Sequence, residues 1–123
     1  RSLLGRKCRF NLWEPNLFVS SRALPREEAL IEYGNNIKRA YTYKSLNRLI
    51  QASAADQTKR AMVEIYKTGK VPLVQIHDEL ALSVKDLSEA EEIKKVMETA
   101  VELKVPSPTD LVVGPNWGDL KNA

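Results

Sequence analysis

An abrupt change of hydrophobic period near residue 70 limits the folds that are open to this chain of 123 residues. Between Tyr43 and Thr68 the apolar residues recur at steps of three, four and seven, which is typical of one long amphipathic helix. Gly69 follows where a helix C-cap belongs. Beyond it, apolar and polar residues alternate on both sides of His77-Asp78-Glu79, which predicts a β-hairpin with these three polar residues at its tip.

This hairpin needs support from helices, because two strands alone are barely stable in water. Its apolar side chains are therefore expected to pack on helices near residues 44–68 and 88–103. These side chains are Val74, Ile76, Leu80 and Leu82. Ser88 and Glu91 have the spacing of a capping box for the second helix. The pattern predicts an α+β fold, with a small antiparallel sheet and its hairpin backed by long helices, in a single domain over residues 1–123.

A further helix is predicted to begin near Pro25, because proline fits a first helical turn and the acids Glu27 and Glu28 suit its positive end. Gly34-Asn35-Asn36 interrupts the apolar spacing, so the pattern fits one broken helix or two short ones. The apolar positions of this region are Ala29, Leu30, Tyr33, Ile37 and Ala40. Residues 111–113 add a last short strand.

Charge and cysteine content disfavour several classes of protein. The net charge of +3 is too small to indicate nucleic-acid binding by itself, but two stretches hold four cations each and no acid. They are residues 1–10, with Arg1, Arg6, Lys7 and Arg9, and residues 38–48, with Lys38, Arg39, Lys44 and Arg48. No apolar run approaches the roughly 20 residues that span a bilayer, so no membrane role is expected. The single cysteine, Cys8, allows no internal disulfide, which favours a cytoplasmic location.

The hairpin tip and the long helix each offer a candidate site. A carboxylate held rigidly at a strand end, such as Asp78, suits a hard cation like Mg²⁺, although most polar triplets of this kind are only hydrophilic turns. One carboxylate cannot complete a two-metal site, so a second aspartate is needed. Asn47 and Gln51 lie four residues apart, and hence on one helix face, where their carboxamides suit the minor-groove acceptors of any base pair. The alternative for this face is a solvated polar surface.

Three ordered blocks together resemble family A DNA polymerases. Leu3-Leu4-Gly5-Arg6-Lys7 is similar to the family's L-G-R-[RK] segment. Residues 46–56, which read LNRLIQASAAD, are similar to its N-x-x-x-Q-[GS]-[TS]-A-A-D helix. Residues 74–80, which read VQIHDEL, are similar to its motif C, usually V-H-D-E, and residues 113–118 resemble its C-terminus. Order and approximate spacing agree over nearly the whole chain.

The resemblance implies a role for each matching residue. Asp78, Glu79 and His77 are implied to be catalytic. Asp78 is implied to be a metal ligand, Glu79 to support that site, and His77 to lie near the primer terminus and touch nucleic acid. Arg6, Asn47 and Gln51 are implied to contact the minor groove or backbone of the new duplex. The cofactor is Mg²⁺, in a two-metal site that a second aspartate outside this chain completes. The partners are primer–template DNA, the incoming dNTP and the remainder of the polymerase.

Departures from the family pattern set the limits of this expectation. Residues 11–43 form a longer stretch than in bacterial members and look more like phage versions, and Tyr43 stands about where those members have an arginine. Ala52 replaces a common glycine. Motif A, with the other metal-binding aspartate, and the fingers helix are not found in the chain.

The expected function is therefore DNA-directed DNA polymerase activity by nucleotidyl transfer to a primer 3′ hydroxyl, as a C-terminal palm fragment or split piece in a bacterial or phage-infected cell. The isolated chain is expected to be inactive and prone to self-association through apolar surface. The alternative is a non-catalytic binding or assembly module derived from a polymerase.

Overall fold

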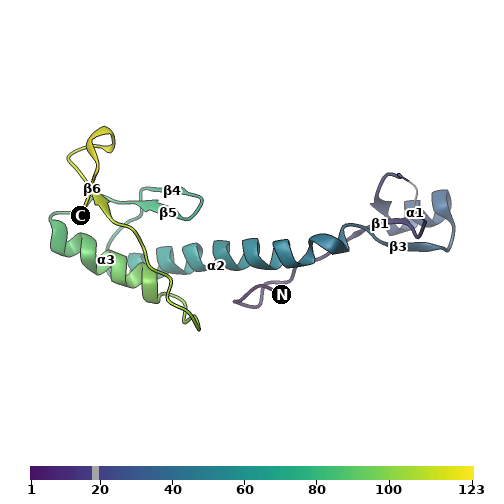
Figure 1. Ribbon diagram of the computed structural model, residues 1–123, viewed down its shortest axis with the longest axis horizontal. Coiled ribbons are helices and arrows are strands. Elements are labelled where there is room, and N and C mark those ends of the chain that lie inside the picture. Colours follow the sequence, from purple (N-terminus) through teal and green to yellow (C-terminus); the bar gives the residue numbers. More distant parts are fainter. Residues whose placement is uncertain (18–19) are drawn as a thin grey trace. The chain divides into compact units, whose positions relative to one another are not determined.

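A computed structural model describes residues 1–17 and 20–123, and within them it confirms the α+β class (Figure 1). The chain divides into two compact units, Arg1–Ser53 and Ala54–Ala123, and helix α2 (Ser45–Lys67) runs through the boundary between them. The single domain over residues 1–123 stays a prediction. Among the described residues, no helix combines the length and apolar character needed to cross a bilayer.

The first unit contains a three-stranded antiparallel sheet with a short helix packed against it. The strand order is β2-β1-β3, with β1 at Leu12–Pro15, β2 at Leu24–Pro25 and β3 at Ile37–Arg39. Helix α1 (Arg26–Tyr33) follows β2 directly. Leu24 and Ala29 are buried between the sheet and this helix, together with Ala40 after β3.

The predicted helical spacing beyond Gly34 is wrong. Helix α1 ends at Tyr33, and Gly34 takes a positive φ of 71°, a conformation that glycine adopts without strain. Ile37, which was expected to continue a helix, instead opens β3 and pairs with Pro15 of β1. The Gly-Asn-Asn sequence is therefore a turn between a helix and a strand, and the apolar spacing that crosses it is coincidental.

The long helix is confirmed. A 3-10 turn, η1 (Thr42–Lys44), leads into the 23 residues of α2. Gly69 closes the helix end with a positive φ of 84° and donates its N–H to the carbonyl of Tyr66 at 3.0 Å. This is the left-handed cap that the sequence predicts, since glycine carries no Cβ to oppose it.

The second unit buries a small apolar core that the later turns of α2 and helix α3 (Leu87–Thr99) supply. Ile65 of α2 is completely buried, with 0% of its surface exposed. The other buried apolar residues of the unit are Ala61, Ala90, Ile93 and Val101. A hairpin of β6 (Val112–Val113) and β7 (Lys121–Asn122) contains the predicted last strand.

Helix α3 begins with a different cap from the predicted Ser88–Glu91 box. Asp86 is the N-cap residue, and its carboxylate accepts the backbone N–H of Glu89 at 2.9 Å. The Glu89 carboxylate in turn accepts the N–H of Lys85 at 2.5 Å and pairs with Lys70. Asp86 and Glu89 have the same three-residue spacing as the predicted pair Ser88 and Glu91, but lie two residues earlier. Ser88 is therefore inside the first turn of the helix. The helix also ends at Thr99, short of the predicted residue 103.

Replacing this cap is expected to weaken the second unit measurably. Asp86→Ala removes the acceptor for the Glu89 N–H, and loss of an N-cap side chain costs about 1 kcal/mol. Urea unfolding followed by circular dichroism should show a lower midpoint. Ser88→Ala is the matched control, since the Ser88 side chain makes no capping bond in the described chain and its replacement should leave the midpoint nearly unchanged.

The motif C segment forms the predicted hairpin with a tighter turn. Strand β4 (Val74–Ile76) pairs with β5 (Glu79–Ala81) in the register Ile76↔Glu79, so the tip consists of His77 and Asp78. The prediction that Glu79 lies at the tip is wrong: Glu79 is the first residue of β5. His77 has a φ of 53°, and the Gln75 side chain donates to its carbonyl at 2.7 Å.

The predicted packing of the hairpin on the helices is wrong for β4. Val74 and Ile76 remain 41% and 44% exposed, whereas Leu80 and Leu82 are half-buried. Within the described residues β4 pairs only with β5, and three-residue strands offer little surface to a helix. The apolar side of β4 is therefore available to another segment.

Candidate active site and DNA interface

The hairpin turn presents Asp78 to solvent. Asp78 and its neighbours His77 and Glu79 are all exposed, and the bond from Gln75 to the His77 carbonyl restrains the turn. Backbone pairing of β4 with β5 fixes the strands on either side. The structure thus brings the three predicted catalytic residues together at one end of a hairpin. Among the described hydrogen bonds and ion pairs, none involves the carboxylate of Asp78 or of Glu79.

These carboxylates fit part of a magnesium site. Mg²⁺ prefers oxygen ligands, keeps several waters and often uses only one or two carboxylates of the protein. Asp78 and Glu79 supply such oxygens at an accessible turn. No group of three histidine, cysteine or acidic residues that could hold a metal ion occurs in the described ranges, 1–17 and 20–123. The two carboxylates of this turn therefore supply only part of the ligand set that a metal ion needs.

Arg6, Asn47 and Gln51, three of the four predicted DNA-binding residues, lie in the first unit, whereas His77 lies in the second. Asn47 and Gln51 are exposed on α2, one helical turn apart. Arg6 reaches the same helix from the N-terminal segment, where its Nη2 donates to the Ala52 carbonyl at 2.9 Å. Ser53 fixes the segment nearby, because its hydroxyl accepts the N–H of Leu3 at 3.0 Å. The structure thus places Arg6 beside the Gln51 end of the carboxamide face.

Two arginines also hold the N-terminal segment at Arg9 and Phe10, through contacts that the sequence did not predict. The Arg48 guanidinium lies 4.5 Å from the Phe10 ring centroid and donates to the Arg9 carbonyl at 3.1 Å. Arg39 of β3 donates to the Phe10 carbonyl at 2.9 Å and lies 5.1 Å from the Trp13 ring. The signal that pointed to this arrangement was the pair of basic stretches without acids. Their meeting could not be read from the sequence, because it depends on the course of the intervening sheet.

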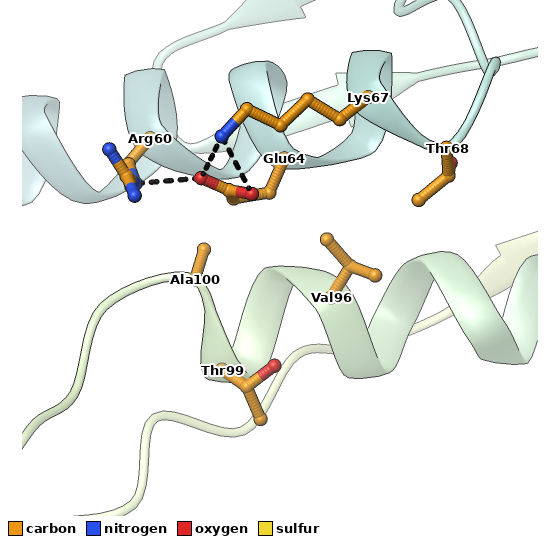
Figure 2. Close-up of a pocket in the computed structure, with 7 residues that line it drawn as sticks. All are labelled: Arg60, Glu64, Lys67, Thr68, Val96, Thr99 and Ala100. Atoms are coloured by element: carbon orange, nitrogen blue, oxygen red, sulfur yellow. Dashed lines mark hydrogen bonds and ion pairs between the residues drawn. The ribbon is translucent and has the colours of Figure 1, made fainter.

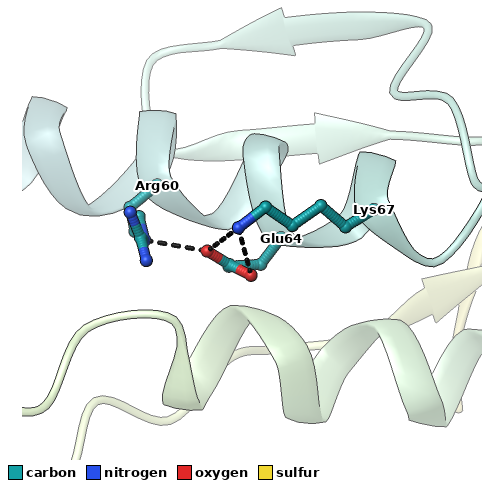
Figure 3. A network of polar contacts seen from close by, with 3 residues as sticks. All are labelled: Arg60, Glu64 and Lys67. Atoms are coloured by element: carbon teal, nitrogen blue, oxygen red, sulfur yellow. Dashed lines mark hydrogen bonds and ion pairs between the residues drawn. The ribbon is translucent and has the colours of Figure 1, made fainter.

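A shallow hollow of about 510 Å³ lies between α2 and α3 in the second unit (Figure 2). Its lining residues are Arg60, Glu64, Lys67, Thr68, Val96, Thr99 and Ala100. Figure 3 shows the Glu64 carboxylate between Arg60, at 2.9 Å, and Lys67, at 3.1 Å. Such neighbouring pairs on one helix contribute about 0.3–0.5 kcal/mol each. These ion pairs stabilise α2 itself. None of the predicted site residues lines the hollow.

Comparisons with known proteins identify the family to which the chain belongs. Residues 2–119 match the family described as DNA polymerase family A, and the chain belongs to that family. The chain is 49% identical over 78 residues to a DNA-directed DNA polymerase of Pseudomonas phage M6, covering 63% of this chain and 12% of that protein.

Two bacterial relatives extend the match. The chain is 43% identical over 83 residues to DNA polymerase I of Deinococcus radiodurans, covering 61% of this chain and 9% of that protein. It is 32% identical over 118 residues to DNA polymerase I of Borreliella burgdorferi, covering 85% of this chain and 13% of that protein. The chain thus spans about an eighth or less of the length of these relatives. No solved structure matches it at a comparable level of significance.

Proposed function

We propose that this chain is the C-terminal part of the palm in a DNA-directed DNA polymerase and takes part in template-directed nucleotidyl transfer to a primer 3′ hydroxyl. The observation that supports this best is the exposed Asp78 on the two-residue turn of β4 and β5, in a chain of DNA polymerase family A. The remainder of the polymerase, with motif A and the fingers helix, is its first partner. The isolated chain is inactive on this proposal.

Asp78 and Glu79 would hold Mg²⁺ together with an aspartate of the remainder. In a two-metal site the bound ions stabilise both the attacking and the leaving oxygen of a phosphoryl displacement. The contribution of this chain is the position of its carboxylates, which the strand pairing and the restrained His77 backbone provide. His77 lies next to Asp78 in the turn, which suits a contact with the primer terminus.

The first unit would hold the duplex. Asn47 and Gln51 offer carboxamides to minor-groove acceptors that recur at every base pair, so their contacts are indifferent to sequence. Arg6 adds a cation beside them. This combination suits an enzyme that must hold any newly made duplex. In the complete enzyme the dNTP would be held mainly by the fingers.

Exposed apolar residues are consistent with a missing neighbour. In addition to the apolar face of β4, Leu46 and Ile50 of α2 are 66% and 58% exposed, and Leu73 before β4 is 65% exposed. Large apolar patches on a protein surface commonly mark an interface. On this proposal the remainder of the polymerase covers them, and the isolated chain self-associates through them.

Binding of the isolated chain to primer–template duplex is expected to be weak, indifferent to sequence and sensitive to salt. The described cations near Asn47 and Gln51 suffice for about two phosphate contacts, so affinity should fall about tenfold between about 50 and 200 mM salt. Fluorescence anisotropy with labelled duplexes of unrelated sequence measures both properties. A strong preference for one sequence, or an affinity that does not change with salt, would instead identify a dedicated binding module.

A further inference from the structure

Two basic segments that are distant in the sequence lie against each other in the first unit. Residues 1–10 and 38–48 contain four cations each and no acid. Arg48 and Arg39 join them by donating to the consecutive carbonyls of Arg9 and Phe10. Folding therefore makes one surface from both segments. We call residues 1–10 and 38–48 together the basic strip.

Lys44 is the most available cation at the η1 end of the basic strip. Its ammonium lies 5.2 Å from the Tyr41 ring centroid and 5.6 Å from that of Tyr43, which is itself 78% exposed. No carboxylate pairs with Lys44 in the described part of the chain, whereas Lys38 is 3.8 Å from Glu14. The two rings hold the lysine side chain in place while its charge remains open to a ligand.

Lys44 is the last residue of η1, directly before α2, and this position indicates what that ligand is. Lys44 stands three residues before Asn47 and seven before Gln51, so it continues the carboxamide face by about one helical turn. Seven residues of helix span about 10 Å, which corresponds to about three base-pair steps of DNA. A compact ammonium is also suited to a phosphate as a point charge.

We propose that Tyr41, Tyr43 and Lys44 form a phosphate contact for the DNA duplex, about three base pairs from the contact made by Gln51. This inference rests on the proposed function, because it extends the same duplex interface. On this proposal the tyrosine rings hold the ammonium towards the phosphate backbone of the DNA. The other cations of the basic strip add a positive electrostatic field. Residues within the 11–43 stretch thereby gain a role in binding DNA.

Lys44→Gln tests this contact through the salt dependence of duplex binding by the full 123-residue chain. Loss of one phosphate contact should lower the magnitude of the slope of log K against log salt by about 0.9 and weaken binding about fivefold near 0.1 M salt. Lys44→Arg keeps the charge and should keep the slope. Lys95→Gln, which removes an exposed cation from α3, is the matched control and should leave the slope unchanged. Circular dichroism checks that each variant is folded.

The possible failures are distinguishable. If the unsubstituted chain binds no duplex, the DNA-binding part of the proposed function fails and this contact with it. If that chain binds but Lys44→Gln has an unchanged slope, only this contact is wrong. An equal loss on an unpaired oligonucleotide, or competition by polyglutamate at the concentration at which duplex competes, would overturn the assignment to a duplex backbone.

Discussion

Asp78→Asn in the complete polymerase is expected to abolish single-nucleotide addition, with a loss of at least about a thousandfold. Asparagine keeps the shape of the side chain but removes the charge of a metal ligand, so the ions that stabilise the transition state are no longer held. Binding of primer–template should change little, because Asp78 is not among the residues proposed to hold the duplex. Rapid-quench measurement of one-nucleotide extension, beside anisotropy measurement of binding, separates the two effects.

Asp110→Asn is the matched control, because it makes the same chemical change at another exposed carboxylate of the second unit and should leave extension intact. The isolated chain should add no nucleotide, since among its described residues no group of three histidine, cysteine or acidic side chains is placed to hold a metal ion. Robust extension by the 123 residues alone, or full activity of the Asp78→Asn polymerase, would overturn the proposed function.

Ile65→Ala is expected to give the largest loss of stability among single truncations in the second unit. Ile65 is the one large side chain that is completely buried within the described residues, and truncation of a buried isoleucine costs about 2–5 kcal/mol. Such a loss is a large fraction of the total free energy of unfolding of a small domain, so the variant should be partly unfolded at room temperature. Urea titration followed by circular dichroism and by tryptophan fluorescence measures the change.

Val63→Ala serves as the comparison on the same helix. Val63 is 49% exposed, so its truncation removes methyl groups without opening a cavity and should alter the free energy of unfolding by less than about 0.5 kcal/mol. Similar losses for the two variants would mean that α2 does not bury Ile65 in solution, and the core of the second unit would have to be placed elsewhere.

The long helix and the hairpin were predictable because each rests on a local pattern sustained over many residues. Helix α2 repeats its apolar spacing for six turns, and Gly69 ends it with a conformation that other residues resist. The hairpin is predictable from alternation, but its turn length is not. Pairing of Ile76 with Glu79 draws the glutamate into the strand, and side-chain polarity alone gives no sign of this.

The remaining errors arise where two local signals compete or where distant segments decide. Asp86 and Ser88 both fit an N-cap, and the structure uses Asp86 because Glu89 can then bond back to Lys85 and pair with Lys70. Ile37 had helical spacing, but pairing with β1 placed it in a strand. The contact of Arg6 with α2 likewise depends on residues 46 positions apart in the chain.

The two-residue turn at His77 and Asp78 makes the hairpin intolerant of any change in length. One residue added or removed between Ile76 and Glu79 would shift β5 by one position and turn every one of its side chains to the opposite face. Leu80 would then lose its half-buried place, and the carboxylate of Asp78 would point in a new direction. Apart from Asp78, the turn is therefore expected to tolerate substitutions better than insertions or deletions, so a library of engineered variants should keep the length of this segment fixed.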